Sequence, residues 1–442
     1  MKIKFLPIIS IAGVLLLASR AFASGELQYA SIVGVDTLLV LFSAFLVFVM
    51  QAGFGMLESG LIRPKNTVDI LMKNFLDFCI ASIGFFIFGY AIAFGTGTPF
   101  MGYSGWLLIG ASSEGLPLYA EWFFHAVFCG VAATIVAGAV AGRMKFKAYL
   151  MYSFLMSALV YPFAVRWVWG GGWLDALGFT DFAGSTVVHA VGGVAGFAGA
   201  IAIGPRIGRY NKDGSPNAIP GHSMPLAALG TLILWFAWFG FNVGSTLEVG
   251  DGSQMAHVAI TTNLAAVSGA LTAMFLAWKK FGKPDLSLTM NGVLAGLVSI
   301  TAPCAFVTPL EAILIGALGG VIMLFGVSFL DRLRIDDPVG AFPVHGLCGI
   351  WGTLAVGLFG RSTLGLARDG LLHGGGFAQF GVQALGTFTI CAAVFVLMLG
   401  IFKAIGMVLG GIRVSREEEL KGLDISLFGQ EAYSGFQIFS TQ

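Results

Sequence analysis

The chain has 442 residues, of which 57% are hydrophobic and only 11% are charged, and its formal net charge at pH 7 is +1. A soluble domain carries about 25% charged residues, so this composition excludes an ordinary water-soluble protein and indicates a membrane protein. A net charge so close to zero also argues against nucleic acid as a partner.

The first 23 residues are predicted to form a signal peptide. Lys2 and Lys4 precede an apolar run over residues 5–18, and Ala21-Phe22-Ala23 is a suitable cleavage site. An uncleaved first helix is the alternative. Cleavage would place the mature N-terminus, near Ser24, outside the cell membrane.

Eleven further apolar segments are predicted to cross the bilayer, because a helix needs about 20 such residues to do so. They run over residues 32–57, 67–95, 118–141, 148–168, 185–204, 224–245, 256–279, 288–303, 309–330, 343–360 and 378–410. We therefore expect an all-α polytopic membrane protein, with a membrane domain over residues 24–411 and a cytoplasmic tail over residues 412–442.

Basic residues gather in the loops that follow the odd-numbered segments. They are Arg63, Lys65, Arg143, Lys145, Lys147, Arg206, Arg209, Lys212, Lys279, Lys280, Lys283, Arg332, Arg334, Arg413 and Arg416. The positive-inside rule then predicts that these segments end in the cytoplasm. The N-terminus would lie outside the inner membrane and the C-terminus in the cytoplasm, in agreement with signal cleavage.

Two stretches of the chain match each other. Residues Asp181 to His189 and Asp337 to His345 both read D-x-x-G-x-x-x-V-H, and they open the fifth and tenth segments. Because the copies are five segments apart, an odd number, the second must be inverted in the membrane. We expect a 5+5 inverted repeat followed by a long C-terminal helix, with the working site near the bilayer midplane.

The spacing within the repeat brings the two histidines together. Each Asp precedes its His by eight residues, about 12 Å along a helix, and the two copies start from opposite surfaces. In a core about 30 Å thick, His189 and His345 both fall near the centre and could touch. Ionisable residues inside the membrane indicate function, although each His could instead satisfy a separate polar contact.

Asp181 and Asp337 are predicted to have a structural role. An acid at the start of a helix accepts hydrogen bonds from exposed backbone N–H groups and interacts favourably with the helix dipole. For Asp181, near the outer surface, a second role in attracting a cation stays open.

Aromatic residues gather where the third, fourth and sixth segments meet the outside, within residues 122–128, 167–173 and 235–241. A single Trp at an interface is ordinary, but several ring faces together attract a small cation, and a nearby hydroxyl could accept a hydrogen bond from it. Below them, Phe128 and Phe241 would form an apolar constriction that hydrated ions cross only at high cost.

Such a path suits ammonium. An ammonium ion at the outer rings would meet an apolar lumen, where it can lose its proton and cross as neutral ammonia. Two hydrogen-bonded imidazoles at the midplane could guide the ammonia, relay the proton, or both. Potassium, which has a similar size, has no proton to give up.

Over nearly all of its mature length, the sequence resembles the ammonium transporter (Amt/Mep/Rh) family, of the bacterial Amt type. The matching stretches are Ala52-Gly-Phe-Gly-Met-Leu-Glu-Ser-Gly-Leu-Ile-Arg63, Trp169-Gly-Gly-Gly-Trp173, Asp181 to His189, Trp238-Phe-Gly-Phe-Asn-Val-Gly-Ser245 and Val344-His-Gly-Leu-Cys-Gly349. The resemblance implies a homotrimer of eleven-helix protomers, with one pore in each. A PII-type regulatory protein at the cytoplasmic face is a further partner that it suggests.

The same resemblance assigns roles to individual residues. It implies an outer ammonium site at Phe124, Trp169 and Ser245, with Phe128 and Phe241 as the gate below it. His189 and His345 would be the central pair, and Trp238 would line the lumen. Thr301 matches a weaker family position near the outer site.

Two departures from the family pattern stand out. His125 replaces a Gln that many members have after the first Phe, and it could alter entry or proton handling, or face the bundle. In the tail, Phe428 stands where a His is common. Residues 434–442 could be an ordinary tail or the start of a linker to a signalling domain.

A sensor and an enzyme are the alternatives to a transporter, and a gas channel is a variant of it. An ammonium sensor would bind the ion in the same fold and signal through the tail, a reading favoured by His125 and the unusual tail. An enzyme with metal-ligating histidines is disfavoured, because no carboxylate or cysteine lies at ligand spacing beside them, so no metal and no cofactor are expected. A gas channel of the Rh type is disfavoured by the complete set of outer aromatic residues.

Overall fold

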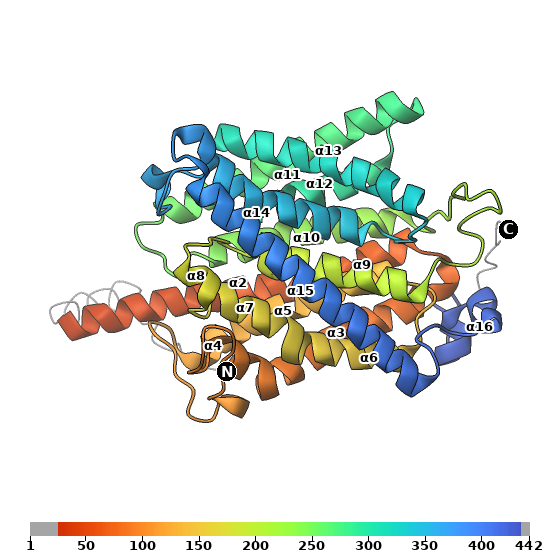
Figure 1. The fold of residues 1–442 in the computed structure, drawn as a ribbon, viewed down its shortest axis with the longest axis horizontal. Coiled ribbons are helices and arrows are strands. Elements are labelled where there is room, and N and C mark those ends of the chain that lie inside the picture. The colour runs from red at the N-terminus through yellow and green to blue at the C-terminus, as the bar shows by residue number, and fades with distance from the viewer. Residues whose placement is uncertain (1–24, 435–442) are drawn as a thin grey trace, which may run out of the picture.

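The computed structural model describes residues 25–434, and the regular secondary structure over that range is entirely helical. The helices lie side by side in one bundle, and the long α15 crosses it obliquely (Figure 1). The predicted signal peptide, residues 1–23, lies outside the described residues.

The α-helices of the bundle and its tail follow each other in chain order. They are α2 (Gly25–Leu61), α3 (Thr67–Gly84), α4 (Tyr90–Phe94), α5 (Leu118–Val140), α6 (Phe146–Leu155), α7 (Tyr161–Val168), α8 (Trp173–Ala176), α9 (Val191–Ile203), α10 (Met224–Gly244), α11 (Ser253–Phe281), α12 (Leu286–Thr301), α13 (Pro309–Leu333), α14 (Cys348–Phe359), α15 (Phe377–Leu409) and α16 (Arg416–Lys421). Single π-helical turns join α3 to α4 and α6 to α7, so each of these pairs forms one continuous span.

Each of the eleven predicted segments coincides with a helical span. Ten spans are long and apolar enough to cross a membrane, and the eleventh, α12, has only 16 residues. Its length is about 24 Å, less than a full hydrocarbon core. Every residue of α12 from Met290 to Thr301 is buried, so other helices rather than lipid surround this short helix.

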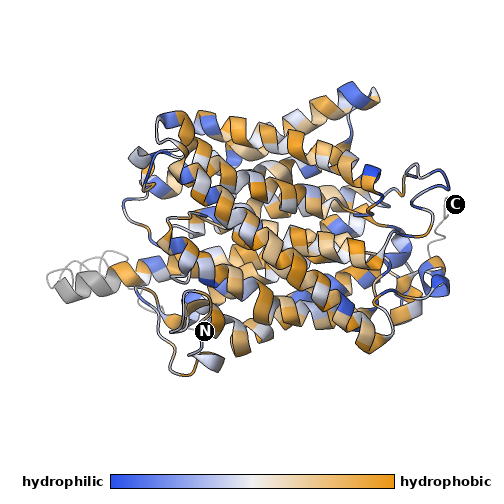
Figure 2. Cartoon of the chain, in the orientation of Figure 1, coloured by the Kyte–Doolittle hydropathy of each residue, from blue (hydrophilic) through white to orange (hydrophobic). Residues whose placement is uncertain are grey.

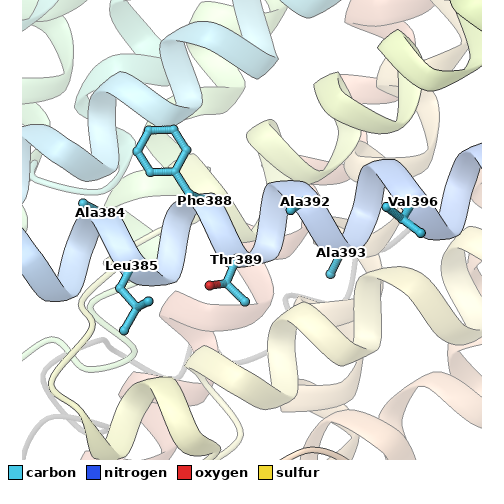
Figure 3. A pocket seen from close by; sticks show the side chains of 7 residues that line it. All are labelled: Ala384, Leu385, Phe388, Thr389, Ala392, Ala393 and Val396. Carbon is cyan, nitrogen blue, oxygen red and sulfur yellow. The ribbon is translucent and has the colours of Figure 1, made fainter.

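The outer faces of the bundle are apolar, as contact with lipid requires. Large hydrophobic side chains such as Phe75 and Phe325 are about two-thirds exposed, and hydrophilic residues concentrate in the loops and at the helix ends (Figure 2). Figure 3 shows a shallow pocket on α15, lined mainly by apolar side chains between Ala384 and Val396. Because this pocket is open to the outside, it is part of the same apolar surface.

The predicted basic loops meet at one end of the bundle, where α16 also lies (Figure 1). Arg206, after α9, binds the Asp336 carboxylate at 2.8 and 2.9 Å, and Arg143 donates to the Asp336 carbonyl at 2.6 Å. Burial alone would raise the pKa of Asp336, but the hydrogen bonds and charge of Arg206, with Arg143, hold that pKa well below its usual range. This end is therefore fixed by buried ion pairs.

The structure confirms the inverted repeat. The residue pair Arg206–Asp336 joins the end of α9 to the segment before the second His motif, so the two repeat helices run antiparallel. The fourth residue of each motif is a glycine at positive φ, Gly184 at +115° and Gly340 at +79°, and each motif continues as a π-helical turn that contains the His.

Candidate functional site

A column of stacked rings runs through the bundle, and α5 and α10 contribute the half of it that lies away from the basic loops, which we name the outer half. Phe124 packs on Phe128 with ring centroids 4.6 Å apart, and Phe128 stacks on Phe241 at 4.0 Å and 21°. Phe128 and Phe241 are 1% and 0% exposed. A hydrated ion cannot pass between rings in contact without displacing one of them, so this stack has the geometry of a closed, apolar gate.

The outer end of the column carries polar groups among aromatic ones. The Trp169 ring lies 6.3 Å from that of Phe128, and its indole N–H donates to the Asp181 carbonyl at 2.8 Å. Ser245 caps the C-terminus of α10, and its hydroxyl donates to the Phe241 carbonyl at 2.9 Å. Since that bond uses the hydroxyl hydrogen, the Ser245 oxygen keeps lone pairs that can accept a hydrogen bond.

His125 lies beside this outer group. Its ring centroid is 4.4 Å from that of Phe94, 5.7 Å from Phe124 and 6.1 Å from Trp169. The side chain is buried, and its Nδ1 has no hydrogen-bond partner within residues 25–434. His125 therefore borders the aromatic cluster directly.

The two repeat histidines meet below the gate. The Nδ1 atoms of His189 and His345 are 3.3 Å apart, and the ring centroids are separated by 5.3 Å. His189 also packs 5.2 Å from the Phe241 ring, which joins the pair to the outer half of the column. Because one Nδ1 must donate to the other, a neutral pair has two different tautomers and can exchange them by moving protons.

Trp238 fixes the ring of the first histidine. It stacks on His189 at 4.8 Å and 17°, and its indole N–H donates to the Thr301 hydroxyl at 2.9 Å. That hydroxyl in turn donates to the Leu297 carbonyl at 2.7 Å. Thr301 thus reaches the ring column through Trp238, at the level of the histidines.

The two aspartates hold the histidine turns in place. The Asp181 carboxylate accepts backbone N–H bonds of 2.8–2.9 Å from all four residues of 184–187. The Asp337 carboxylate accepts bonds of 3.1 and 2.8 Å from Gly340 and Phe342. Both aspartates therefore have the capping geometry expected from the sequence.

Beyond the histidine pair, the column ends at a small internal cavity. The Phe54 ring lies 5.8 Å from that of His345, and both residues line the cavity together with Glu58, Asn291 and Val344. The sequence assigned no role to Phe54 or Glu58. A signal is nevertheless present in the sequence, because a Glu within an apolar segment is costly to bury and indicates a function.

Another group that sequence reasoning passed over lies along α3. Lys73 pairs with Asp69 at 2.8 Å, and the carboxylate of Asp77 accepts hydrogen bonds from the hydroxyls of Tyr149 and Ser153. These charges are buried in the bundle. Within residues 25–434, no group of three His, Cys, Asp or Glu side chains is arranged to hold a metal ion.

Comparison with known proteins gives a consistent result. A model of the Ammonium Transporter Family matches residues 38–433. The ammonium transporter Amt2 of Archaeoglobus fulgidus is 44% identical over 425 residues, which cover 92% of this chain and 90% of that protein.

Solved structures agree with this match. One described as "Sensor Amt Protein" has a TM-score of 0.86 and 37% identity, covering 90% of this chain and 99% of the other. Candida albicans Mep2 has a TM-score of 0.82 and 28% identity, covering 92% of this chain and 94% of the other.

Proposed function

This chain belongs to the ammonium transporter family, and we propose that it transports ammonium by separating the ion into ammonia and a proton along the ring column. Ammonium transport itself follows from the family. The steps and the residues that perform them are our proposal, and the observation that carries them is the 3.3 Å contact between His189 and His345.

The first step is recruitment of ammonium at Phe124, Trp169 and Ser245. Aromatic ring faces attract a small cation through their quadrupoles, with Trp the strongest. Ser245 supplies a hydroxyl oxygen as hydrogen-bond acceptor, and the neighbouring Phe128 supports the site from below. His125 borders this site and is placed to influence the protons there.

Deprotonation follows at the gate, where the proton passes from ammonium to Nε2 of His189, whose ring packs 5.2 Å from that of Phe241. A bare charge between Phe128 and Phe241 would lose its hydration and gain no paired charge, which is heavily unfavourable. Neutral ammonia carries no such cost. Because potassium cannot release a proton, the same gate excludes it while it passes ammonia.

The histidine pair then carries ammonia and proton across the midplane. Ammonia can hydrogen-bond to imidazole nitrogen atoms, and His189 Nε2 is buried without a partner within residues 25–434. The Nδ1 contact allows a proton taken up by His189 to leave from His345, as the two rings exchange protonation. Net charge then crosses the membrane with each ammonium.

The location, assembly and partners of the chain belong to the same proposal. We place the chain in the inner membrane as a homotrimer, with residues 1–23 as a signal peptide and 24–411 as the membrane domain. The end that carries the basic loops and the tail, residues 412–442, would face the cytoplasm by the positive-inside rule. A PII-type protein or a signalling domain would meet the chain at that face, where Tyr433 bonds His222 at 2.6 Å.

The test is the ammonium-evoked current of proteoliposomes on a solid-supported membrane, comparing the unmodified protein with His189→Ala. We expect a saturable current that is lost in the variant. Absence of current and of ammonia flux in the unmodified protein, with ammonium binding in calorimetry, would instead indicate a sensor. The observation that favours a sensor is the likeness to a structure described as "Sensor Amt Protein". The family model and the Amt2 relative favour transport.

A further inference from the structure

The cavity beyond His345 contains one carboxylate. Its lining residues come from α2, α5, α12 and the second His motif, and Glu58 is the only acidic residue among them. The Glu58 side chain is 2% exposed. A carboxylate buried at membrane depth is costly, so its position beside the transport path calls for a function.

Glu58 continues the line of the ring column. It follows Phe54 by four residues on α2, so both side chains lie on the same face of that helix. The Phe54 ring contacts His345, and Glu58 lies one turn, about 6 Å, further along the helix axis. The Glu58 carboxylate is therefore the one that lines the cavity beside the histidine pair.

One oxygen of Glu58 is fixed within the bundle. Oε2 accepts a hydrogen bond of 2.8 Å from the Asn74 side-chain amide, and the Asn74 oxygen accepts one of 2.6 Å from Thr134. The other oxygen, Oε1, lies against Gly138, where an added Cβ would be 3.0 Å away. The small residue at position 138 leaves room for this carboxylate, and the Asn74–Thr134 chain sets its orientation.

A purely structural role fits the buried carboxylate of Asp77 better than it fits that of Glu58. Both oxygens of Asp77 accept hydroxyl hydrogen bonds, from Tyr149 and Ser153, and Asp77 does not line the cavity. Glu58 receives one side-chain hydrogen bond within the described residues and borders a cavity beside a histidine, of about 10 Å³, which is room for one water-sized molecule.

We propose that Glu58 is the inner proton acceptor of the transport path, an inference that rests on the proposed function. The imidazolium of His345 gives its proton to the Glu58 carboxylate, directly or through water, leaving neutral imidazole and a carboxylic acid. The acid then gives the proton to ammonia, which re-forms ammonium beside the carboxylate. No electrons are transferred in either step.

The cavity suits the cation that results. The carboxylate balances its charge, and an ion in a buried site needs such a partner. The Asn291 amide donates to the Val339 carbonyl at 3.1 Å, which leaves the Asn291 oxygen able to accept a hydrogen bond from ammonium. The cavity therefore offers ammonium a place to re-form before it enters the cytoplasm.

Methylammonium uptake into proteoliposomes, with and without an inside-negative potassium diffusion potential, tests this proposal together with the ammonium-evoked current. Glu58→Gln keeps the shape of the side chain and the bond from Asn74 but cannot take up a proton. We expect its current to fall about 100-fold, the lower end of what a positioned acid–base group contributes, and its uptake to lose the response to potential. Glu58→Asp should retain that response.

Asp77→Asn is the matched control, a carboxylate-to-amide change in the same bundle, and it should keep both current and response. Size-exclusion elution of every variant checks the fold. A Glu58→Gln variant that conducts like the unmodified protein overturns the inference, and so does a folded Glu58→Asp variant that ignores the potential. An unmodified protein without current would contradict the proposed function instead.

Discussion

His189 and His345 are 156 positions apart in the chain, yet their Nδ1 atoms lie 3.3 Å from each other at the centre of the bundle. The contact arises because two copies of one motif enter the membrane from opposite sides and are capped in the same way by Asp181 and Asp337. Each ring continues a column that begins at the outer aromatic residues. The pair thus connects the two halves of the proposed path.

At the outer site, Ser245→Ala should weaken ammonium binding without slowing the later steps. A hydrogen bond to a charged group contributes about 1.5–3 kcal/mol, so the concentration for half-maximal current should rise about tenfold or more while the maximal current stays the same. Thr246→Ala, which removes a neighbouring hydroxyl, is the control and should leave the half-maximal concentration unchanged. A fall in maximal current alone in Ser245→Ala would contradict binding at this hydroxyl.

At the gate, Phe241→Ala should reduce selectivity. Removing the ring that stacks on Phe128 leaves space for water, and a hydrated potassium ion then no longer meets a closed apolar barrier. We expect potassium currents to appear in proteoliposomes that lack them with the unmodified protein. Phe42→Ala, a change on the lipid-exposed face, should conduct no potassium. Potassium exclusion by a folded Phe241→Ala variant would show that the stack is not the barrier.

Beside the histidines, Thr301→Val should disturb the orientation of the Trp238 ring in the column. The change removes the acceptor of the Trp238 indole N–H, and a buried donor without a partner costs about 1–3 kcal/mol. Trp238 would then lose its fixed stacking on His189, and the ammonium current should fall severalfold. Thr231→Val is the control, because that hydroxyl donates only to the backbone of its own helix. Equal currents in both variants would exclude this orienting role.

At the end with the basic loops, Asp336→Asn should lower the thermal unfolding midpoint by several degrees at pH 7. The buried Arg206 would lose its charge partner, and breaking such a pair costs about 3–5 kcal/mol. Because the pKa of Asp336 is lowered in the folded protein, its contribution is complete above its unfolded value of about 4 and is lost as the pH falls below it. The difference between variant and unmodified protein should therefore persist from pH 8 to pH 5 and shrink at lower pH.

The position of the histidine pair could be predicted from the sequence because the same motif occurs twice. Eleven apolar segments and one motif present twice indicated that His189 and His345 could meet. The copies are an odd number of segments apart, which predicted their inversion, and the Asp-to-His spacing placed both histidines near the midplane. The capping role of the aspartates followed from their position before each helix. These features depend on local pattern and chain order, which a single sequence contains.

Other features depend on packing between distant segments. The contact of Thr301 with Trp238 joins α12 to α10, and the bond of Glu58 to Asn74 joins α2 to α3. Neither pairing has a sequence pattern of its own. The π-helical turn at each histidine was not predicted from the sequence either. The same holds for the close approach of the repeat helices, where a Cβ added at Gly193 would overlap the Gly346 backbone nitrogen.

The claim that ammonium gives up its proton inside the protein is tested most directly by recording the ammonium-evoked current in light and heavy water. A glycerol-containing buffer matched in viscosity to heavy water serves as control. If proton transfer between the histidine rings limits the rate of each cycle, as we propose, heavy water should lower the saturating current severalfold and the viscous control should not. A current that is the same in both solvents would mean that no proton transfer limits transport, and it would contradict this account.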